Sequence, residues 1–169
     1  MNEPGLYRAA VALVIAPDPD ALLIIRRAQH EGDPWSGHMA LPGGRAEPGD
    51  PDLVSTAIRE TREEVGIDLD RRHFIGALDD VAPRTTVLPP IMVRPCVFVA
   101  PSRPTLTLNP EVASAEWVEL SLLRDPATYQ PVTVEAGTRS QIRNAFVTPH
   151  GIVWGLTERI LSTLLRHLS

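Results

Sequence analysis

Three glutamates stand close together in the chain, at a spacing that suits metal chemistry. Glu60, Glu63 and Glu64 occupy positions i, i+3 and i+4, so a helix would carry all three carboxylates on one side. Like charges at this spacing repel one another, and solvent or a bound cation relieves the repulsion. A hard divalent ion such as Mg²⁺ or Mn²⁺ prefers oxygen ligands. The triplet is therefore either a solvated helix face or part of a metal site.

A glycine-containing segment lies upstream of these acids. Residues 41–45 are Leu-Pro-Gly-Gly-Arg, and adjacent glycines let a backbone carbonyl or amide approach a ligand closely. A turn of this kind, leading into a helix with clustered carboxylates, is typical of a site for a metal ion and a phosphate group. The context therefore favours the metal site over the solvated face.

The sequence predicts a helix over residues 51–65 that positions the glutamates. Asp50 suits the N-cap, Pro51 the first helical position and Gly66 the C-terminal stop. At about 100° per residue, one stripe of this helix would face a core, about 135° from the carboxylates. The stripe consists of Val54, Ile58, Thr61 and Val65.

Strands are predicted on both sides of this helix. They cover residues 9–15, 21–25, 39–41, 73–81, 91–100 and 115–120, and a second amphipathic helix covers 154–168. Strands with helices between and after them indicate an α/β or α+β sandwich. The length of 169 residues and the lack of a dividing linker favour one domain over residues 1–169.

The composition limits the partners and the compartment. All 16 basic residues are arginine and the net charge is −5, which disfavours a general electrostatic hold on nucleic acid or an anionic membrane. An anionic ligand would then need local positive charge. We expect no signal peptide or membrane span, because no apolar run approaches about 20 residues. The only cysteine, Cys96, cannot form an internal disulfide, so a cytoplasmic location is expected.

Residues 44–67 resemble the Nudix box of the Nudix hydrolase superfamily. The pattern of that box is Gly, five residues, Glu, seven residues, then Arg-Glu-apolar-any-Glu-Glu-any-Gly-apolar. The chain has Gly44 and, one residue further along than this pattern requires, the run from Arg59 to Ile67. Because Arg59, Glu60, Glu63, Glu64 and Gly66 keep the spacing of the pattern among themselves, the resemblance is specific.

Two positions depart from the pattern. Thr61 takes the apolar position, and Pro51 takes the position of the first Glu. Proline cannot be a ligand or an ion-pair partner, so the contribution of the first Glu comes from Asp50 or Asp52, or is absent.

The chain is most similar to the coenzyme A diphosphatase branch of the superfamily. Residues 55–61 and 152–157 resemble that branch. Residues 22–37 match its upstream signature in part: they keep the Leu-Leu pair, an Arg pair and the final Gly, are two residues longer and lack a Leu-Arg pair.

The resemblance implies a Nudix fold, a mixed β-sheet sandwiched between helices (α/β/α). It also implies Mg²⁺-dependent hydrolysis of the pyrophosphate linkage of a nucleoside diphosphate derivative, with Mn²⁺ able to substitute. Coenzyme A or its thioesters, cleaved to 3′,5′-ADP and 4′-phosphopantetheine, is the favoured substrate, and ADP-ribose, NADH or a (d)NTP is the alternative. The resemblance is compatible with a homodimer, since many relatives are dimers.

The resemblance assigns roles to the residues of the box. Glu60 and Glu64 are the principal metal ligands, Glu63 is a third ligand or a base acting through water, and the Gly43 carbonyl is a backbone ligand. Arg59 orients the carboxylates or contacts a phosphate.

Other candidates lie outside the helix. The predicted substrate-binding residues flank the glycine-containing segment, since arginine binds phosphate bidentately and an aromatic ring can stack on a base: Arg26, Arg27, Arg45, Gly44 and Trp35. Glu111 is a candidate distal acidic ligand or base, or a cap.

Two other classes of protein share the scaffold. A relative of isopentenyl diphosphate isomerase would need a catalytic cysteine before the box, whereas Cys96 follows it. A ligand-binding Nudix domain without catalysis is the other alternative, and such domains tend to lose the carboxylates that this chain retains.

Overall fold

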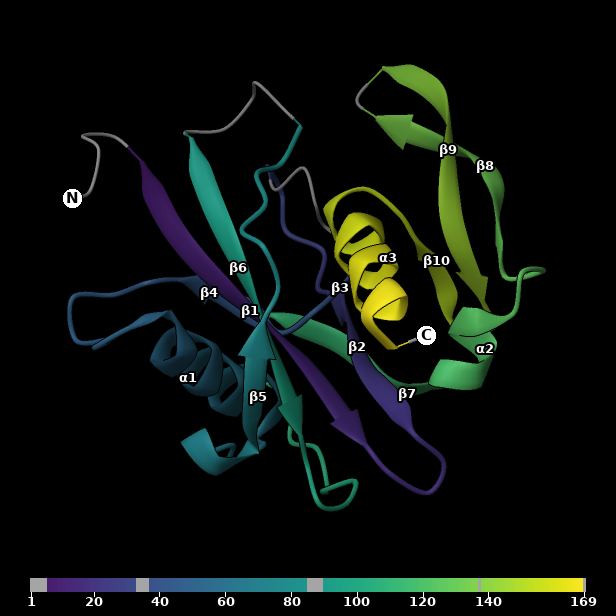
Figure 1. The fold of residues 1–169 in the computed structure, drawn as a ribbon. Helices are drawn as coiled ribbons and strands as arrows, with labels where there is room; N and C mark the ends of the chain where they lie inside the picture. The colour runs from purple at the N-terminus through teal and green to yellow at the C-terminus, as the bar shows by residue number, and fades with distance from the viewer. Residues whose placement is uncertain (1–5, 33–36, 85–89, 137, 169) are drawn as a thin grey trace.

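The first two strands form the predicted hairpin, and a mixed sheet is built around it (Figure 1). The computed structural model describes residues 6–32, 37–84, 90–136 and 138–168. β1 (Tyr7–Ala16) and β2 (Ala21–Arg27) are rich in aliphatic and β-branched residues, most of them buried. Both strands are therefore central in the sheet, with side chains buried on both of its faces.

β1 and β2 pair with each other only beside their connecting turn, where Ile15 faces Leu22. Further from the turn, β4 (Gly43–Arg45) pairs with the start of β1, and β3 (Met39–Ala40) pairs with the end of β2. The two long strands thus diverge, and the short strands β3 and β4 occupy the space between them.

Three more strands complete the mixed sheet. β6 (Ile91–Val99) runs parallel to β1, β5 (Phe74–Ala77) is antiparallel to β6, and β7 (Val112–Glu119) is antiparallel to β2. A separate antiparallel sheet consists of β8 (Tyr129–Ala136), β9 (Arg139–Thr148) and β10 (Gly151–Val153).

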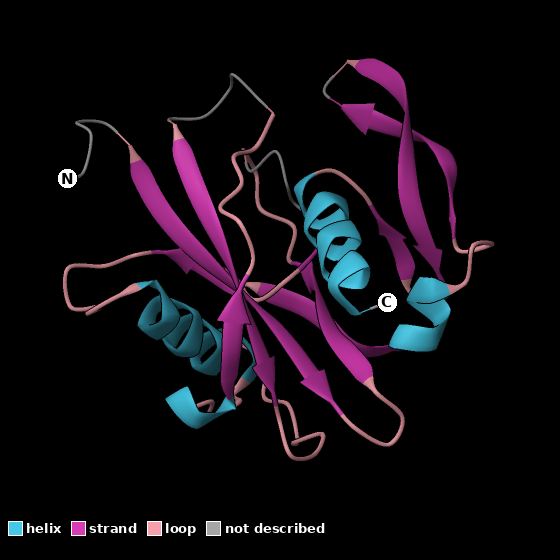
Figure 2. Ribbon diagram, viewed as in Figure 1, coloured by secondary structure: helices cyan, strands magenta, loops and turns pink. Residues whose placement is uncertain are grey.

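Helices cover both faces of the mixed sheet, and Figure 2 shows them set apart by its strands. α1 (Leu53–Val65) packs on one face and α3 (Leu156–Leu168) on the other. Because side chains alternate along a strand, Val14 of β1 lies in the apolar cluster with α1, and Leu13 lies in the cluster with α3. This layering confirms the predicted α/β/α sandwich.

Both of these helices have 13 residues, and no helix of the described part of the chain is long and apolar enough to cross a membrane. Two short elements complete the fold. The 3₁₀ helix η1 (Arg71–His73) precedes β5, and α2 (Leu120–Arg124) links β7 to the second sheet.

α1 begins two residues later than predicted. Asp52, and not Asp50, is the N-cap: its carboxylate accepts a hydrogen bond of 2.9 Å from the Ser55 N–H. Pro51 therefore lies outside the helix. Gly66 ends the helix as predicted, in the left-handed conformation with φ 75°.

The predicted faces of α1 are right only in part. Thr61 and Val65 are buried, but Val54 and Ile58 are half-buried. Glu64 is buried too, so the three carboxylates do not share one solvated side.

Other element boundaries also differ from the prediction. Residues 43–45, predicted as a turn, form β4, because their backbone pairs with β1. The strand predicted over 73–81 ends at Ala77, after an irregular register near Gly76, and Val81 forms only an isolated bridge with Val93. The predicted helix over 154–168 starts at Leu156. The sequence did not predict α2 or the second sheet.

The cap of α1 gives a stability prediction. Asp52→Ala should lower the free energy of unfolding by about 1 kcal/mol at pH 7, because the first turn of α1 loses its acceptor. Arg71 forms an ion pair with Asp52 at 2.9 Å and lowers the pKa of this carboxyl to about 2. The contribution of ionised Asp52 to the free energy of unfolding is therefore complete above the unfolded pKa of about 3.9, and it is lost as the pH falls toward 2.

Urea denaturation at pH 7 and pH 2.5 measures this difference. Asp68→Ala is the control, since it removes only the exposed ion pair between Asp68 and Arg62. Equal losses of stability in the two variants at pH 7 would contradict the capping role.

Candidate active site

α1 lies so close to β4 that its carboxylates contact the backbone of the strand. The N–H of Gly43 donates a hydrogen bond of 2.8 Å to Oε1 of Glu64. The Glu60 carboxylate lies against Gly44, where a Cβ would stand 2.5 Å from Glu60 Oε1. A side chain at residue 44 would therefore displace this carboxylate, so the close approach requires glycine.

The three glutamates differ in exposure and in pKa. The side chain of Glu63 is 52% exposed and that of Glu60 is 14% exposed, whereas Glu64 is 3% exposed. Burial raises the pKa of Glu64 to about 7, and the charges of Glu60 and Glu111 act in the same direction. Burial also raises the pKa of Glu60, against the effect of Arg59. Burial is therefore the main cause of both shifts, and repulsion among the acids adds to it.

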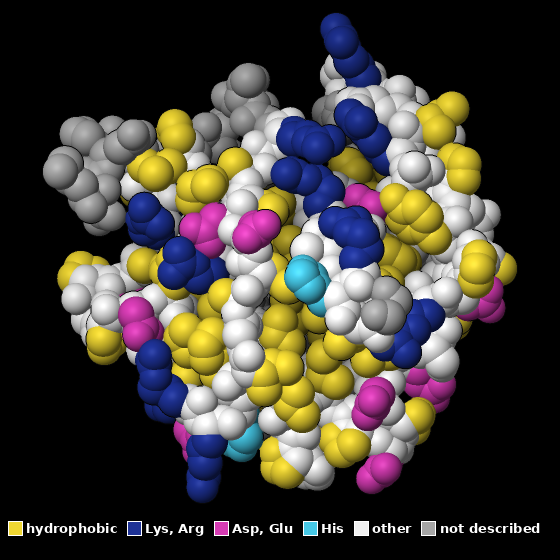
Figure 3. Space-filling model, viewed as in Figure 1, with side chains coloured by type: hydrophobic (Ala, Val, Ile, Leu, Met, Phe, Trp, Pro, Cys, Tyr) yellow, Lys and Arg dark blue, Asp and Glu magenta, His cyan; other side chains and the backbone are white. Residues whose placement is uncertain are grey.

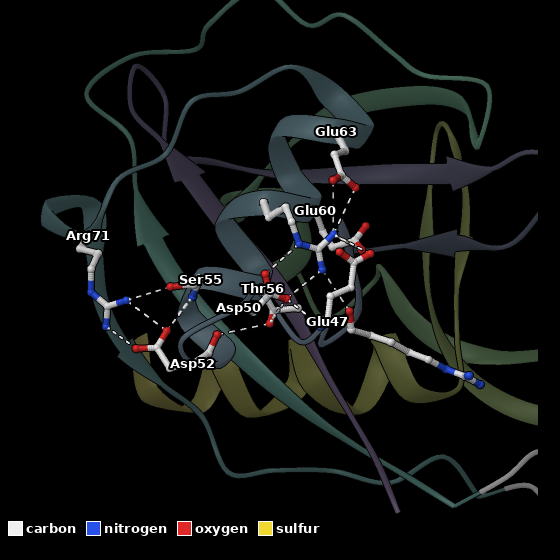
Figure 4. Close-up of polar contacts among 10 residues, drawn as sticks. Glu47, Asp50, Asp52, Ser55, Thr56, Glu60, Glu63 and Arg71 are labelled. Atoms are coloured by element: carbon white, nitrogen blue, oxygen red, sulfur yellow. Dashed lines mark hydrogen bonds and ion pairs between the residues drawn. The ribbon is translucent and has the colours of Figure 1, made fainter.

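Arg59 joins the acids of α1 to the loop before the helix, and Figure 4 labels the acids that it contacts, among them Asp50, Glu60 and Glu63. Its Nε and Nη2 donate to the two carboxylate oxygens of Asp50 at 2.9 and 3.0 Å. Its Nη1 donates to Glu60 at 3.0 Å and to Glu63 at 3.3 Å. This guanidinium fork holds the pKa of Asp50 well below its usual range. Of the two predicted roles of Arg59, the geometry supports orientation of the carboxylates.

Asp50 is the acid beside Pro51 that contacts this arginine. Its side chain is 7% exposed and also accepts hydrogen bonds from the Thr56 hydroxyl and the Glu47 N–H, both at 2.9 Å. Asp52 caps α1 instead. Asp50 is therefore the residue placed to serve for the missing first Glu of the pattern.

Glu111 reaches the same site although it is distant in sequence. Its charge contributes to the raised pKa values of Glu60 and Glu64. The side-chain oxygen of Asn109 accepts a hydrogen bond of 2.9 Å from the Glu111 N–H, and the Asn109 N–H donates to the Glu64 carbonyl at 3.1 Å. These bonds hold the start of β7 against α1. The structure therefore brings Glu111 to the acids of α1, where the sequence predicted a distal acid.

Arg26, predicted to bind substrate, is engaged by backbone. Its Nη1 donates to the Gly37 carbonyl at 2.8 Å and its Nη2 to the His150 carbonyl at 2.6 Å. A Cβ on Gly151 would stand 2.5 Å from the same Nη2. Arg26 therefore joins two connecting segments near the end of β2.

The other predicted substrate residues lie in different surroundings. Arg27 lies near the buried acids, since its charge lowers the pKa of Glu64. The Arg45 guanidinium stacks on the ring of Tyr7, 4.3 Å from its centroid. Trp35 lies outside the described residues. Of the three predicted arginines, Arg27 is the one that the structure brings to the carboxylates.

The sequence analysis missed some of these neighbours. Glu47, whose carboxylate lies 3.6 Å from Arg59, was not singled out. β8 and β9 were also missed, although Val132, Val134 and Ala136 alternate with polar residues before Gly137, which is a strand signal.

The carboxylate oxygens of the site suit a divalent cation, although they do not point to one common position. Within residues 6–32, 37–84, 90–136 and 138–168, no group of three or more acidic, histidine or cysteine side chains could hold a metal ion as it stands. Glu60 is turned to Arg59 and Glu64 to Gly43. Yet the nearby carboxylates offer hard oxygen donors, and a Mg²⁺ ion would offset the repulsion among them.

Comparisons with known proteins agree with this architecture. The sequence matches the NUDIX domain family over residues 6–136. It is 33% identical over 165 residues to a Yersinia pestis protein named uncharacterized Nudix hydrolase NudL, which covers 96% of this chain and 78% of that protein. It is 40% identical over 120 residues to a Schizosaccharomyces pombe protein named uncharacterized protein C14C4.10c, which covers 68% of this chain. The alignment spans 36% of that longer relative.

A solved structure shows the same fold over nearly the whole chain. It is the NUDIX domain of Shewanella oneidensis NrtR, complexed with ADP ribose. The TM-score is 0.68 and the match covers 99% of this chain and 94% of that chain, at 14% identity. Because the identity is low, this likeness concerns the fold alone.

The close approach of β4 to β1 gives a second prediction. Gly43→Ala should lower the free energy of unfolding by about 1–3 kcal/mol, because the new Cβ would meet the Ala10 carbonyl oxygen and would stand 2.7 Å from the Val11 Cα, and backbone atoms cannot turn aside as a side chain can. Gly49→Ala is the matched control, since no heavy atom lies within 4 Å of a Cβ there. Denaturant unfolding compares the two, and equal stability would contradict the packing described.

The pKa of Glu64 gives a third prediction. A raised folded pKa means that stability is complete below the unfolded value of 4.5 and declines as the pH rises toward 7. In chelator, Glu64→Gln should therefore be more stable than the wild type at pH 8, by an amount on the order of 2 kcal/mol, and the difference should shrink at pH 5. Thermal denaturation at both pH values measures it, with the exposed Glu63→Gln as control. An advantage that is equal at both pH values would refute this account.

Proposed function

The chain belongs to the NUDIX family and is a Nudix hydrolase, and from this premise we propose that it uses a divalent metal ion to cleave the pyrophosphate linkage of a nucleoside diphosphate derivative. The observation that carries the proposal is the placement of two carboxylates, the half-buried Glu60 and the buried Glu64, against the glycines of β4, where burial raises the pKa of both. A catalytic domain needs such carboxylates to hold a metal ion. In a domain that only binds a ligand, nothing would offset the free-energy cost of withdrawing them from water.

Glu60 and Glu64 would hold the metal ion, with Glu63 or Glu111 as a further oxygen donor. When bound, Mg²⁺ or Mn²⁺ neutralises charge on the phosphate oxygens and positions the attacking water. The residues of the chain prepare this arrangement. The Gly43 N–H fixes one oxygen of Glu64, and Arg59 fixes one oxygen of Glu60.

Glu63 is assigned as the base, because it is the most exposed glutamate of the three and faces water. Arg59 donates to it at 3.3 Å and keeps it beside Glu60. The role of Glu63 would be to accept the proton of the attacking water.

Positive charge for the phosphates comes from arginine. Arg27 lies among the carboxylates and is assigned to a substrate phosphate, and Arg45 stands at the end of β4 next to Arg59. Figure 3 shows arginine side chains gathered over the start of α3 and the β8–β9 hairpin, although the net charge is −5. This basic surface supports an anionic substrate.

Coenzyme A or a thioester of it is the proposed substrate within this class. The support is the similarity of residues 55–61 and 152–157 to the coenzyme A diphosphatase branch. ADP-ribose, NADH and (d)NTPs are the alternatives that the test must include. We assign the activity to one domain, because side chains of α3 and β9 join the core cluster of the mixed sheet.

The fourth prediction concerns the two buried ligands. Glu60→Gln and Glu64→Gln should each lower kcat by about two or more orders of magnitude while the circular dichroism spectrum stays that of the wild type, because a neutral amide is a poor metal ligand. Hydrolysis is followed by chromatography of the products with and without Mg²⁺. Glu119→Gln is the control, since this exposed acid ends β7 and its carboxylate accepts from the Ser121 hydroxyl, outside the candidate site.

A panel of coenzyme A, ADP-ribose, NADH and nucleoside triphosphates identifies the substrate. Release of 3′,5′-ADP and 4′-phosphopantetheine identifies coenzyme A. Wild-type turnover in both glutamine variants would exclude the proposed mechanism.

A further inference from the structure

β5 is an edge strand of the mixed sheet. It pairs with β6 on one side, and among the described residues no strand pairs with its other side. The free side of an edge strand presents unpaired backbone N–H and C=O groups, which form a template for a strand of another chain. Figure 3 shows apolar side chains at the surface around β5. This edge is therefore a candidate interaction surface.

The middle of this edge is apolar and open. Ile75 is 64% exposed, and the register between β5 and β6 shifts at this residue, so it has no cross-strand partner on β6. Val99 of β6 is exposed as well. Gly76 follows Ile75, and no heavy atom lies within 4 Å of a Cβ built there. The edge thus combines an exposed apolar side chain with backbone that a second strand can approach closely.

Charges of opposite sign flank the edge. η1 carries Arg71 and Arg72 immediately before β5, and Asp79 follows the strand. The side chain of Arg72 is 83% exposed, and its ion pair with Asp70 is exposed too. Exposed ion pairs contribute little to stability, so the Arg72 guanidinium remains available to a second carboxylate. Asp79 is exposed as well. β5 thus has basic side chains at its start and acidic side chains after its end.

This order of charges matches a second copy of the same chain. When two β5 edges pair antiparallel about a twofold axis at Gly76, residues 71–73 of each copy face residues 79–81 of the other. The arginines of one protomer then lie beside the aspartates of its partner, twice in one interface. A parallel pairing would place like charges opposite each other, which is destabilising. The charges therefore favour antiparallel self-pairing.

We propose that the β5 edge binds the β5 edge of a second copy, so that one sheet continues across the twofold axis of a symmetric dimer. Ile75 and Gly76 lie at the centre of this interface, and the charged residues lie at its two ends. Because each copy contributes one strand of only four residues, the dimer is weak, with a dissociation constant of about 1–100 µM. The proposal does not depend on the hydrolase activity.

Sedimentation equilibrium of the full chain, over about 1–300 µM protein, gives the Kd of the dimer. Ile75→Asp should raise this Kd at least about tenfold, because it places a carboxylate from each copy at the centre of the interface. The side chain of Ile75 is exposed, so the monomer should keep its fold and its circular dichroism spectrum. Ile142→Asp is the matched control, since Ile142 is 76% exposed but lies on β9 of the separate sheet.

Exchange of the charges tests whether the partner is a second copy. Arg72→Asp and Asp79→Arg should each raise the Kd at least about tenfold, because each makes two contacts of the symmetric dimer repulsive. An equimolar mixture of the two variants should form a mixed dimer with a Kd within about threefold of the wild type, because every contact is then attractive again. Arg124→Asp on α2 is the control, since it changes the net charge equally and lies outside β5 and its flanking segments.

Three results would overturn the proposal. A monomeric mass at every concentration would leave the edge to a strand of a different protein. A dimer whose Kd is unchanged in Ile75→Asp and in both charge variants would be held by another surface. Failure of the mixed charge variants to associate would exclude the antiparallel pairing. Because only mass is measured, none of these results bears on the proposed function.

Discussion

The contact between the carboxylates of α1 and the backbone of β4 is the constraint on which the rest of the structure depends. Glu64 needs the Gly43 N–H as a donor, and Glu60 needs the space that a side chain at Gly44 would fill. Both demands are met only if residues 43–45 run as a strand directly beside the helix. That strand needs a partner, and it finds one in the first half of β1 because β2 has turned away.

Charge balance follows from the same contact. A helix that brings acids into a half-buried site needs a cation, and Arg59 provides it from within the helix. Asp50 holds that guanidinium in place from the loop, so one cation is shared by acids on both sides of the helix start. Glu64 lies further inside than Glu60 and Glu63, and burial is the main cause of its raised pKa.

The elements with strong periodicity could be predicted from the sequence, and those defined by tertiary contacts could not. The β1–β2 hairpin and α3 have long apolar patterns, so their positions followed from the residues. β4 has no apolar pattern, since Gly43 and Gly44 have no side chains, and only its pairing with β1 makes it a strand. The true N-cap was missed because Asp50 and Asp52 both stand beside Pro51 and both suit an N-cap. Only their ion pairs distinguish them: Asp52 pairs with the distant Arg71, and Asp50 pairs with Arg59.

The division of the core into two apolar clusters also bears on how such a protein diverges. α1, with its acids, packs in one cluster, and the second sheet packs with α3 in the other. Substitutions in the β8–β9 hairpin or around Trp154 therefore alter packing on a face that the acids do not share. The packing of α3 with the second sheet can therefore vary without a change in the apolar cluster that holds α1 and its acids.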